Sequence, residues 1–321
     1  MSIEHLPSSR GETMHLSRRQ FCALGATALG AGGCATDAEQ ILYSAGTDRP
    51  KATVPAGATD CHMHFFDKRI PTVPGAPVLH PDALASDYRA YQRRVGTQRC
   101  VVVTPSAYGI NNVVMEQGLA ALGANSRGVA VVRPDVTEAE LQRLHRLGVR
   151  GVRFNLVQAG AVTIDQAKLL SLRLAGMGWH IQFHLPGERL PDAYELISGL
   201  PSRIVFDHMG RISMAQGPSS PSYQALRRLI DKGNTWVKLS GPYLISKHEP
   251  DYPEASMLAK ALVNAAPERM VWGSDWPHAT EQVRPNDASL YDLLTEWAPS
   301  EAVRRRILVS NPAALYDFPA A

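Results

Sequence analysis

His62 and His64 stand two residues apart in a short run of strand-forming residues. Residues i and i+2 of a strand point to the same face, so both imidazoles are expected on one side. Neutral imidazole nitrogens are good ligands for zinc. A motif this short also fits two histidines that serve only the core, so residues elsewhere must decide between the two interpretations.

Further histidines and a carboxylate stand where later strand-like runs end. His184, His208 and Asp275 each end such a run. In a barrel of parallel strands the carboxyl ends form one face, where catalytic residues gather. Burying three imidazoles and a carboxylate without a function would be costly. Since imidazole and carboxylate suit zinc or manganese, we predict one divalent ion bound by His62, His64, His184 and Asp275.

Two arginines supply positive charge near the same ends. In the run 149–156, apolar residues occupy one strand face, and Arg153 and Asn155 occupy the other. This alternation directs Arg153 toward the barrel mouth, where a guanidinium attracts a carboxylate or another anion. Arg211, three residues after His208, is a second candidate. An ion pair with a barrel acid remains open for Arg153, and a solvated surface position remains open for Arg211.

Eight β-rich runs alternate with helical patterns and would position these residues. Near-continuous apolar runs such as 100–103 are typical of parallel strands buried on both faces. We predict a closed (β/α)8 barrel. An open doubly wound sheet is the alternative, but no glycine-rich nucleotide loop follows the first strand. The strands are expected at 58–66, 99–105, 128–134, 149–156, 180–185, 203–209, 235–241 and 270–277, and helices at 137–147, 164–177, 223–232 and 253–266.

Composition limits the remaining function classes. The chain has 321 residues, of which 45% are hydrophobic, and a formal net charge of +3. This apolar fraction supports a sizeable core, which excludes disorder over most of the chain. Four cysteines are too few for a disulfide scaffold. The small, dispersed charge gives no reason to expect nucleic acid as a partner.

The amino-terminal segment 1–34 reads as an export signal. The pair Arg18–Arg19 precedes a phenylalanine and a mild apolar stretch, a pattern typical of twin-arginine signals. Cys34 follows small residues in an arrangement similar to a lipoprotein cleavage site. We expect a linker at 35–55, a barrel at 56–321, and a periplasmic protein that contacts the membrane only if Cys34 is lipidated. A tail with two chance arginines is the other interpretation.

Five segments, in order along the chain, carry a family resemblance. They are DCHMHFFD, VRGVRFN, IVFDHMGR, VKLSGPY and WGSDWPH. Together they resemble the amidohydrolase superfamily, and most closely its group of 2-pyrone-4,6-dicarboxylate lactonases and sulfomuconolactonases. The resemblance covers roughly residues 56–318 and implies an amidohydrolase-type (β/α)8 TIM barrel.

The resemblance also implies roles for matching positions. Asp275 is expected to act as general base, with His208 in hydrogen-bonding support. Asn112 lies in the loop after the second strand that matches a family segment near the substrate. The residues expected to bind substrate are Arg153, Arg211, Ser106, Tyr108, Asn155, Tyr243 and His278.

Three departures from the family pattern matter. His184 replaces a tyrosine of the dicarboxylate lactonases, which work without metal, and it restores the ligand set of metal-dependent members. Leu244 stands where an arginine would bind a substrate carboxylate, which speaks against a dicarboxylate substrate. Arg153 and Asn155 occupy the stretch where a bridging lysine would stand, so a carbamate-bridged two-metal centre is not expected.

These observations favour a metal-assisted hydrolase that opens a small anionic lactone in aromatic-compound degradation. A zinc-dependent decarboxylase of the same superfamily is one alternative. The other is an exported, non-catalytic barrel that binds its ligand. The intact set of histidines and aspartate argues against the second alternative, because a binding protein has no need of a proton-transfer carboxylate. The sequence does not indicate the oligomeric state.

Overall fold

The computed structural model describes residues 41–76, 80–157 and 162–319. The chain divides into a unit of residues 1–37 and a compact unit of residues 38–321, and the description concerns the second. The predicted export signal, including Cys34, lies outside the described residues.

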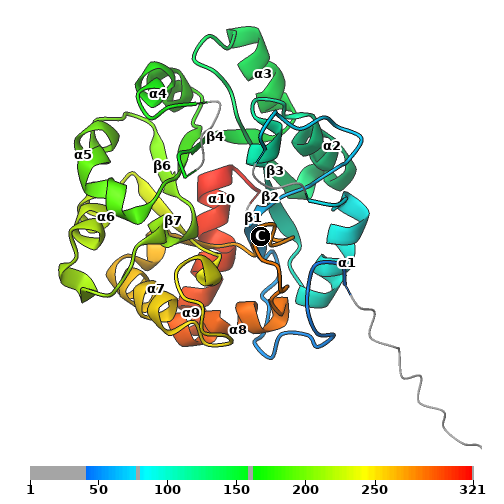
Figure 1. Ribbon diagram of the computed structural model, residues 1–321, viewed down its shortest axis with the longest axis vertical. Helices are drawn as coiled ribbons and strands as arrows, with labels where there is room; N and C mark the ends of the chain where they lie inside the picture. The colour runs from blue at the N-terminus through cyan, green and yellow to red at the C-terminus, as the bar shows by residue number, and fades with distance from the viewer. Residues whose placement is uncertain (1–40, 77–79, 158–161, 320–321) are drawn as a thin grey trace, which may run out of the picture. The chain divides into compact units, whose positions relative to one another are not determined.

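Eight strands form one parallel sheet in the order β1 to β8, with helices between them. Figure 1 shows α1 to α8 around the outside of the ring of strands. The predicted (β/α)8 barrel is thus confirmed. The strands are β1 Thr59–Met63, β2 Arg99–Val103, β3 Ser126–Ala130, β4 Val149–Asn155, β5 His180–His184, β6 Arg203–Phe206, β7 Thr235–Leu239 and β8 Met270–Trp272.

The barrel closes between β1 and the segment after β8. The amide of His64 donates to the carbonyl of Trp276 at 2.8 Å, and the amide of Asp275 donates to the carbonyl of His62 at 2.8 Å. This closure sets the first-strand histidines directly beside Asp275, although more than 200 residues separate them in the chain.

The four predicted helices are present within two residues at each end. In α3 the hydroxyl of Thr137 accepts from the amide of Glu140, as the capping pattern predicts, and Gly148 follows at a positive φ of 102°. The helices are α1 Ala85–Val95, α2 Val113–Leu122, α3 Glu138–Arg146, α4 Gln166–Gly176, α5 Leu190–Ser198, α6 Pro221–Asp231, α7 Pro253–Ala265, α8 Asp287–Trp297, α9 Glu301–Arg305 and α10 Asn311–Tyr316.

Several strands end earlier than the apolar runs suggest. The run expected at 270–277 forms a strand only to Trp272, and the run expected at 203–209 only to Phe206. Beyond these points the chain turns, with His208 at φ 50° and Asp275 at φ 64°. Residues other than glycine rarely adopt this left-handed region, and such strain concentrates at functional sites.

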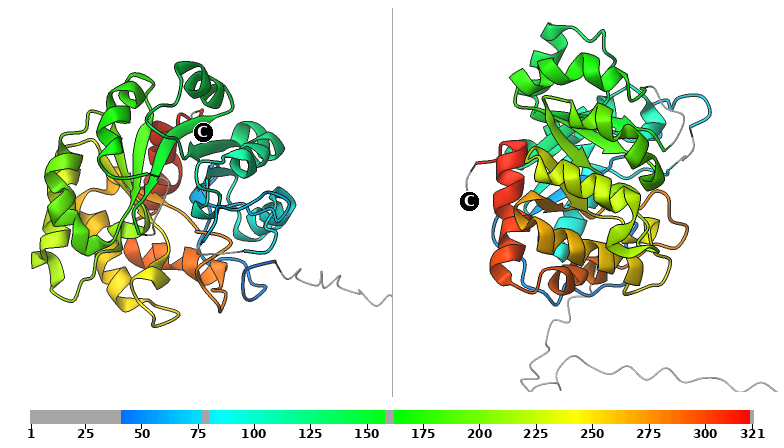
Figure 2. Two further views of the ribbon diagram at one scale, coloured as in Figure 1. Left: turned by 45° about the horizontal axis from the view of Figure 1, so that its top comes forward. Right: turned by 90° about the vertical axis from the view of Figure 1, so that its left-hand side faces the viewer.

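The amino-terminal end of the barrel is sealed by the end of the chain. Tyr316 and Phe318 pack against apolar side chains of the barrel interior. Arg99, Arg127 and Arg203, near the starts of three strands, donate to carbonyl groups of this carboxy-terminal segment. Figure 2 (right) shows α10, in red, as an outer layer at one end of the barrel. A ligand must therefore enter at the opposite end, where the strands finish.

The described part of the predicted linker packs on the barrel. Arg94 of α1 donates to the carbonyl of Asp48 at 2.7 Å and to the hydroxyl of Ser44 at 2.9 Å. The barrel unit thus includes residues well before position 56. Cys61 and Cys100 are buried free thiols. Among the described residues, no helix is both long enough and apolar enough to cross a membrane.

Candidate active site

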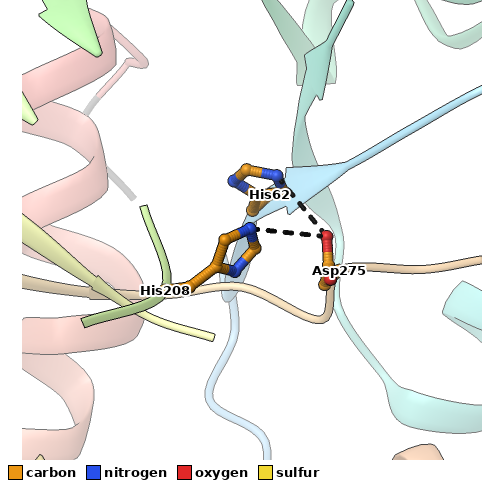
Figure 3. Close-up of side chains that lie close together, drawn as sticks. All are labelled: His62, His208 and Asp275. Carbon is orange, nitrogen blue, oxygen red and sulfur yellow. Dashed lines mark ion pairs between the residues drawn. The ribbon is translucent and has the colours of Figure 1, made fainter. Parts of the chain in front are cut away.

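The carboxylate of Asp275 lies among three imidazoles. Its Oδ1 atom is 3.5 Å from Nε2 of His62, 3.6 Å from Nε2 of His64 and 3.9 Å from Nε2 of His208. Figure 3 shows His62 and His208 facing the same carboxylate oxygen. The turns after β6 and β8 therefore bring residues from three distant parts of the sequence to one point at the end of β1.

Two glycines leave room for this arrangement. A Cβ atom on Gly241 would lie 2.8 Å from Nδ1 of His208, and one on Gly273 would lie 2.7 Å from the Cβ atom of His62. Both distances are shorter than real Cβ contacts allow. Side chains at these positions would displace the two histidines from the carboxylate.

Hydrogen-bond partners determine which ring nitrogen of His64 carries the proton. Its Nδ1 atom is 2.8 Å from the carbonyl oxygen of Val103, which can only accept. Nδ1 is therefore the donor, and Nε2 of the neutral ring has a free lone pair. That lone pair faces Nε2 of His62 at 3.2 Å.

The donor atoms fit a single metal ion. Four ligand atoms placed about 2.1 Å from a tetrahedral zinc lie roughly 3.4 Å from one another. The separations among His62, His64 and Asp275 are 3.2, 3.5 and 3.6 Å. Ligand atoms of His62, His208 and Asp275 also lie within 4.8 Å of one another. His62, His64, His208 and Asp275 are thus the residues that could hold the ion.

His184 has a different neighbour. Its Nδ1 atom lies 3.2 Å from Nη2 of Arg153, a group that only donates. Nδ1 therefore accepts, and the proton of the neutral ring sits on Nε2, a buried atom that has no hydrogen-bond partner among the described residues. His184, Asp207 and His208 form a second group of atoms within 4.8 Å. A metal-ligand role for His184 stays a prediction, and it would require this hydrogen bond to break.

A buried network of charges lies beneath the imidazoles. Asp207 accepts from Arg153 at 3.2 Å and from Gln182 at 3.0 Å, and its Oδ1 atom lies 3.4 Å from Nζ of Lys238. The same oxygen lies 3.1 Å from Nδ1 of His62. Arg153 therefore forms an ion pair with a barrel acid, as one interpretation of the sequence allowed.

Sequence reasoning did not single out Asp207 or Lys238. A usable signal was present, because Lys238 is a charged residue within the apolar strand β7 and Asp207 directly precedes His208. Burial acts to raise the pKa of Asp207, but His62 and Lys238 outweigh it and hold the pKa well below its usual range. Burial also lowers the pKa of Lys238.

The imidazoles of the site are neutral at pH 7. Burial lowers the pKa of His64 to about 4. Burial likewise lowers the pKa values of His62, His184 and His208. Neutral rings retain the lone pairs that metal binding requires.

A cavity of about 630 Å³, including its open mouth, reaches this cluster. Its walls carry two guanidinium groups, from Arg153 and Arg211, and several apolar side chains, among them Leu244. Asn155 donates to the hydroxyl of Ser106 on the same wall. The lining also includes His64, His184, His208 and Asp275.

Four residues expected near the substrate do not line this cavity. Tyr108 exchanges hydrogen bonds with the backbone of Asp67, and Asn112 bonds the backbone of Val131. The buried Tyr243 and His278 lie behind Asp275 and bond one another. Substrate contact by these four side chains stays a prediction, and the hydrogen bonds that they make within the protein favour a supporting role.

Comparison with known proteins agrees with this geometry. The model of the Amidohydrolase family matches residues 59–318. A 2-pyrone-4,6-dicarboxylate hydrolase from Comamonas testosteroni is 32% identical over 85% of this chain and 94% of its own length. A 4-sulfomuconolactone hydrolase from Rhizobium radiobacter is 34% identical over 82% of this chain and 91% of its own.

Two further comparisons extend the group. A D-galactarolactone isomerase from Agrobacterium fabrum is 32% identical over 84% of this chain and 94% of its own length. A crystal structure of an Agrobacterium tumefaciens protein, 31% identical, superimposes with a TM-score of 0.79 over 85% of this chain and all of that one. With a matching family model, a shared barrel and histidines and an aspartate gathered at the strand ends, this chain is a member of the amidohydrolase family.

Proposed function

We propose that this protein hydrolyses a small anionic lactone formed during the degradation of aromatic compounds. The observation that carries the proposal is a carboxylate surrounded by neutral imidazoles at the base of a cavity with two guanidinium groups. Relatives named as lactone hydrolases, which align over most of this chain, support it.

Asp275 is the general base. Its Oδ2 atom accepts from the hydroxyl of Tyr243 at 2.7 Å, which leaves Oδ1 to take a proton from the attacking water. The resulting carboxylic acid then returns the proton to the departing ring oxygen. His208 supports this proton transfer, because its Nε2 atom lies 3.9 Å from Oδ1 of Asp275. Its Nδ1 atom lies 3.0 Å from the hydroxyl of Ser240, which orients the ring.

His184 is suited to stabilise the oxyanion that develops on the lactone carbonyl. Its Nε2 atom carries a proton, because Nδ1 accepts from Arg153, and this proton has no partner among the described residues. A buried donor that is already oriented lowers the barrier without reorganisation at the moment of reaction. Arg153 fixes this tautomer through its contact with Nδ1.

A single zinc or manganese ion fits the donor set described above. When bound to His62, His64, His208 and Asp275, such an ion would polarise a carbonyl and lower the pKa of a bound water. The separations of their ligand atoms suit such an ion, and second partners hold the far sides of His64, His208 and Asp275.

Arg211 holds the anionic group of the substrate. It lines the cavity, and in the described part of the chain no carboxylate pairs with its guanidinium. Arg153, by contrast, is already neutralised by Asp207 at 3.2 Å. With Leu244 as an apolar wall, the cavity has one available cation, which favours a substrate with one anionic group over a dicarboxylate.

A continuous pH assay on a lactone panel tests this function. The panel contains 4-sulfomuconolactone, 2-pyrone-4,6-dicarboxylate and a neutral six-membered lactone, and each reaction is repeated with Asp275→Asn. Wild type should release one proton per anionic lactone opened, and the variant should be about 1,000-fold slower or worse, as expected when a principal proton-transfer group is lost. Equal rates for the two proteins, or no opened lactone, would refute the proposal.

Product analysis separates hydrolysis from the neighbouring reactions. A lactone isomerase would give a product of unchanged mass, as the named activity of one relative implies. A decarboxylase would release carbon dioxide without consuming water. Mass spectrometry of products formed in ¹⁸O-labelled water should instead show one labelled carboxylate oxygen per turnover.

We also propose that the protein is exported to the periplasm by its twin-arginine segment. The pair Arg18–Arg19 before an apolar stretch supports this. Periplasmic fractions should contain the mature chain, and Arg18→Lys combined with Arg19→Lys should retain the precursor in the cytoplasm. Membrane association that Cys34→Ala abolishes would indicate lipidation, and full-length wild-type protein in the cytoplasm would refute export.

A further inference from the structure

A chain of buried side chains lies behind Asp275, on the side away from the cavity. The hydroxyl of Tyr243 donates to Oδ2 of Asp275 at 2.7 Å and lies 2.9 Å from Nδ1 of His278. Nε2 of His278 lies 3.1 Å from both carboxylate oxygens of Asp287. Three hydrogen bonds thus connect the proposed general base to a second carboxylate.

Tyr243, His278 and Asp287 are almost fully shielded from solvent. Tyr243 is 2% exposed, His278 is 0% and Asp287 is 1%. Buried polar groups without a function are costly unless each one is satisfied, and every member here has its partner. The three residues come from the turn after β7, the turn after β8 and the start of α8, so no single local motif explains why they meet.

The direction of each bond follows from chemistry. A carboxylate can only accept, so Tyr243 must donate to an ionised Asp275, and Nε2 of His278 must donate to Asp287. Because the single proton of Tyr243 is used on Asp275, Nδ1 of His278 must donate to the Tyr243 oxygen, which requires the doubly protonated ring. Burial, followed by the charge of Asp275, raises the pKa of Tyr243 well above its usual value and keeps the phenol protonated. Asp287 is the first residue of α8, where the helix dipole favours a negative charge.

We propose that Asp287, His278 and Tyr243 form a positioning relay that holds Asp275 with Oδ2 occupied and Oδ1 turned to the imidazoles. This inference rests on the proposed function of Asp275 as general base. Tyr243 is the member that touches the carboxylate. His278 fixes the hydroxyl oxygen of Tyr243 from behind, and Asp287 orients the ring of His278.

The relay differs from a substrate contact in what it controls. Neither Tyr243 nor His278 lines the cavity, so their loss should affect turnover and not substrate affinity. With Oδ2 unpartnered, Asp275 can rotate, and the oxygen facing the imidazoles is no longer fixed. Because the relay acts in series, breaking it at Asp287 should add nothing once Tyr243 is gone.

Tyr243→Phe, Asp287→Asn and the double variant test the relay, with Tyr291→Phe as control. Tyr291 is 1% exposed on the same helix as Asp287, and within the described part of the chain its hydroxyl has no hydrogen-bond partner. Tyr243→Phe should lower kcat about 10- to 100-fold at constant KM, the range for loss of a hydrogen bond behind a metal ligand. The double variant should match Tyr243→Phe, and the control should match wild type.

Zinc affinity of the metal-free proteins, measured by competition with a chromogenic chelator, is a readout that needs no lactone. Tyr243→Phe should weaken zinc binding about 10- to 100-fold, again without a further loss in the double variant. A higher KM with unchanged kcat, multiplicative effects of the two substitutions, or unchanged zinc affinity would each overturn the relay. Absence of lactone opening by wild type would refute the proposed function and leave the zinc result to decide the relay.

Discussion

Lys238→Met should strengthen zinc binding, because Lys238 and Asp207 place opposite demands on one atom of His62. Nδ1 of His62 lies 3.2 Å from Nζ of Lys238 and 3.1 Å from Oδ1 of Asp207. The ammonium can only donate and the carboxylate can only accept. If Nδ1 accepts from Lys238, Nε2 of the neutral ring carries the proton and cannot bind metal. If Nδ1 donates to Asp207, the lone pair of Nε2 is free.

The expected magnitude follows from this competition. A hydrogen bond to a charged group contributes about 1.5–3 kcal/mol. Removing the ammonium removes that preference for the wrong tautomer, and every 1.4 kcal/mol corresponds to about a factor of ten in affinity. Lys238→Met should therefore raise zinc affinity about 10- to 100-fold. Asp207→Asn should lower it by a similar factor, because the carboxylate that holds the competent tautomer is lost.

Competition titration at pH 7.5 in 0.15 M salt measures both effects. Arg153→Met is the matched control, since it also removes a buried cation paired with Asp207 but leaves Nδ1 of His62 between its two neighbours. Urea unfolding in the presence of a chelator checks that each metal-free variant is folded. Unchanged or weaker zinc binding in Lys238→Met would refute the tautomer argument. An equal gain in Arg153→Met would assign the effect to general charge repulsion instead.

Three further outcomes are expected. Arg211→Met should raise KM about 10- to 100-fold for an anionic lactone and leave a neutral lactone unaffected, as steady-state kinetics would reveal. His184→Tyr should keep one equivalent of zinc, measured by elemental analysis, but lose turnover. Loss of the zinc would instead indicate that His184 is a metal ligand. Burial lowers the pKa of His180 to about 3 from 6.5, so the unfolded chain binds this proton first and stability falls as pH drops from about 6.5 to about 3. His180→Phe should remove about 1.4 kcal/mol per pH unit from this loss of unfolding free energy. Urea unfolding of both proteins at pH 7.5 and 4.5 measures the difference, and an unchanged pH dependence would refute the role of His180.

The fold could be predicted because its signals are local and repeated. Each buried strand is a short apolar run, and α3 begins at a capping threonine and is followed closely by a glycine. Strand ends were harder to predict, because the apolar residues Met209 and Trp276 lie beyond the polar turns that carry His208 and Asp275. A left-handed residue at those points depends on contacts across the barrel, and the chain around it carries no separate signal.

The convergence of His62, His64, His208 and Asp275 was within reach of sequence reasoning. All four stand at strand ends, and parallel strands of a barrel present those ends on one face. The side of Asp275 on which each neighbouring side chain lies could not be predicted from the sequence. Tyr243 and His278 lie in motifs beside the site, yet their side chains point behind Asp275. Motif position gives proximity, whereas the side of the carboxylate on which a residue lies depends on the packing of α8.

Hydrogen-bond direction then divides the site between two kinds of histidine. The carbonyl of Val103 makes His64 present a lone pair, whereas the guanidinium of Arg153 makes His184 present a proton. Residue type alone cannot distinguish these roles, because both are histidines at strand ends. The distinction arises from the hydrogen-bond partner of Nδ1 in each ring, and the sequence does not show which residue that partner is. A metal ligand and an oxyanion donor can therefore be assigned only once the partner of each far nitrogen is known.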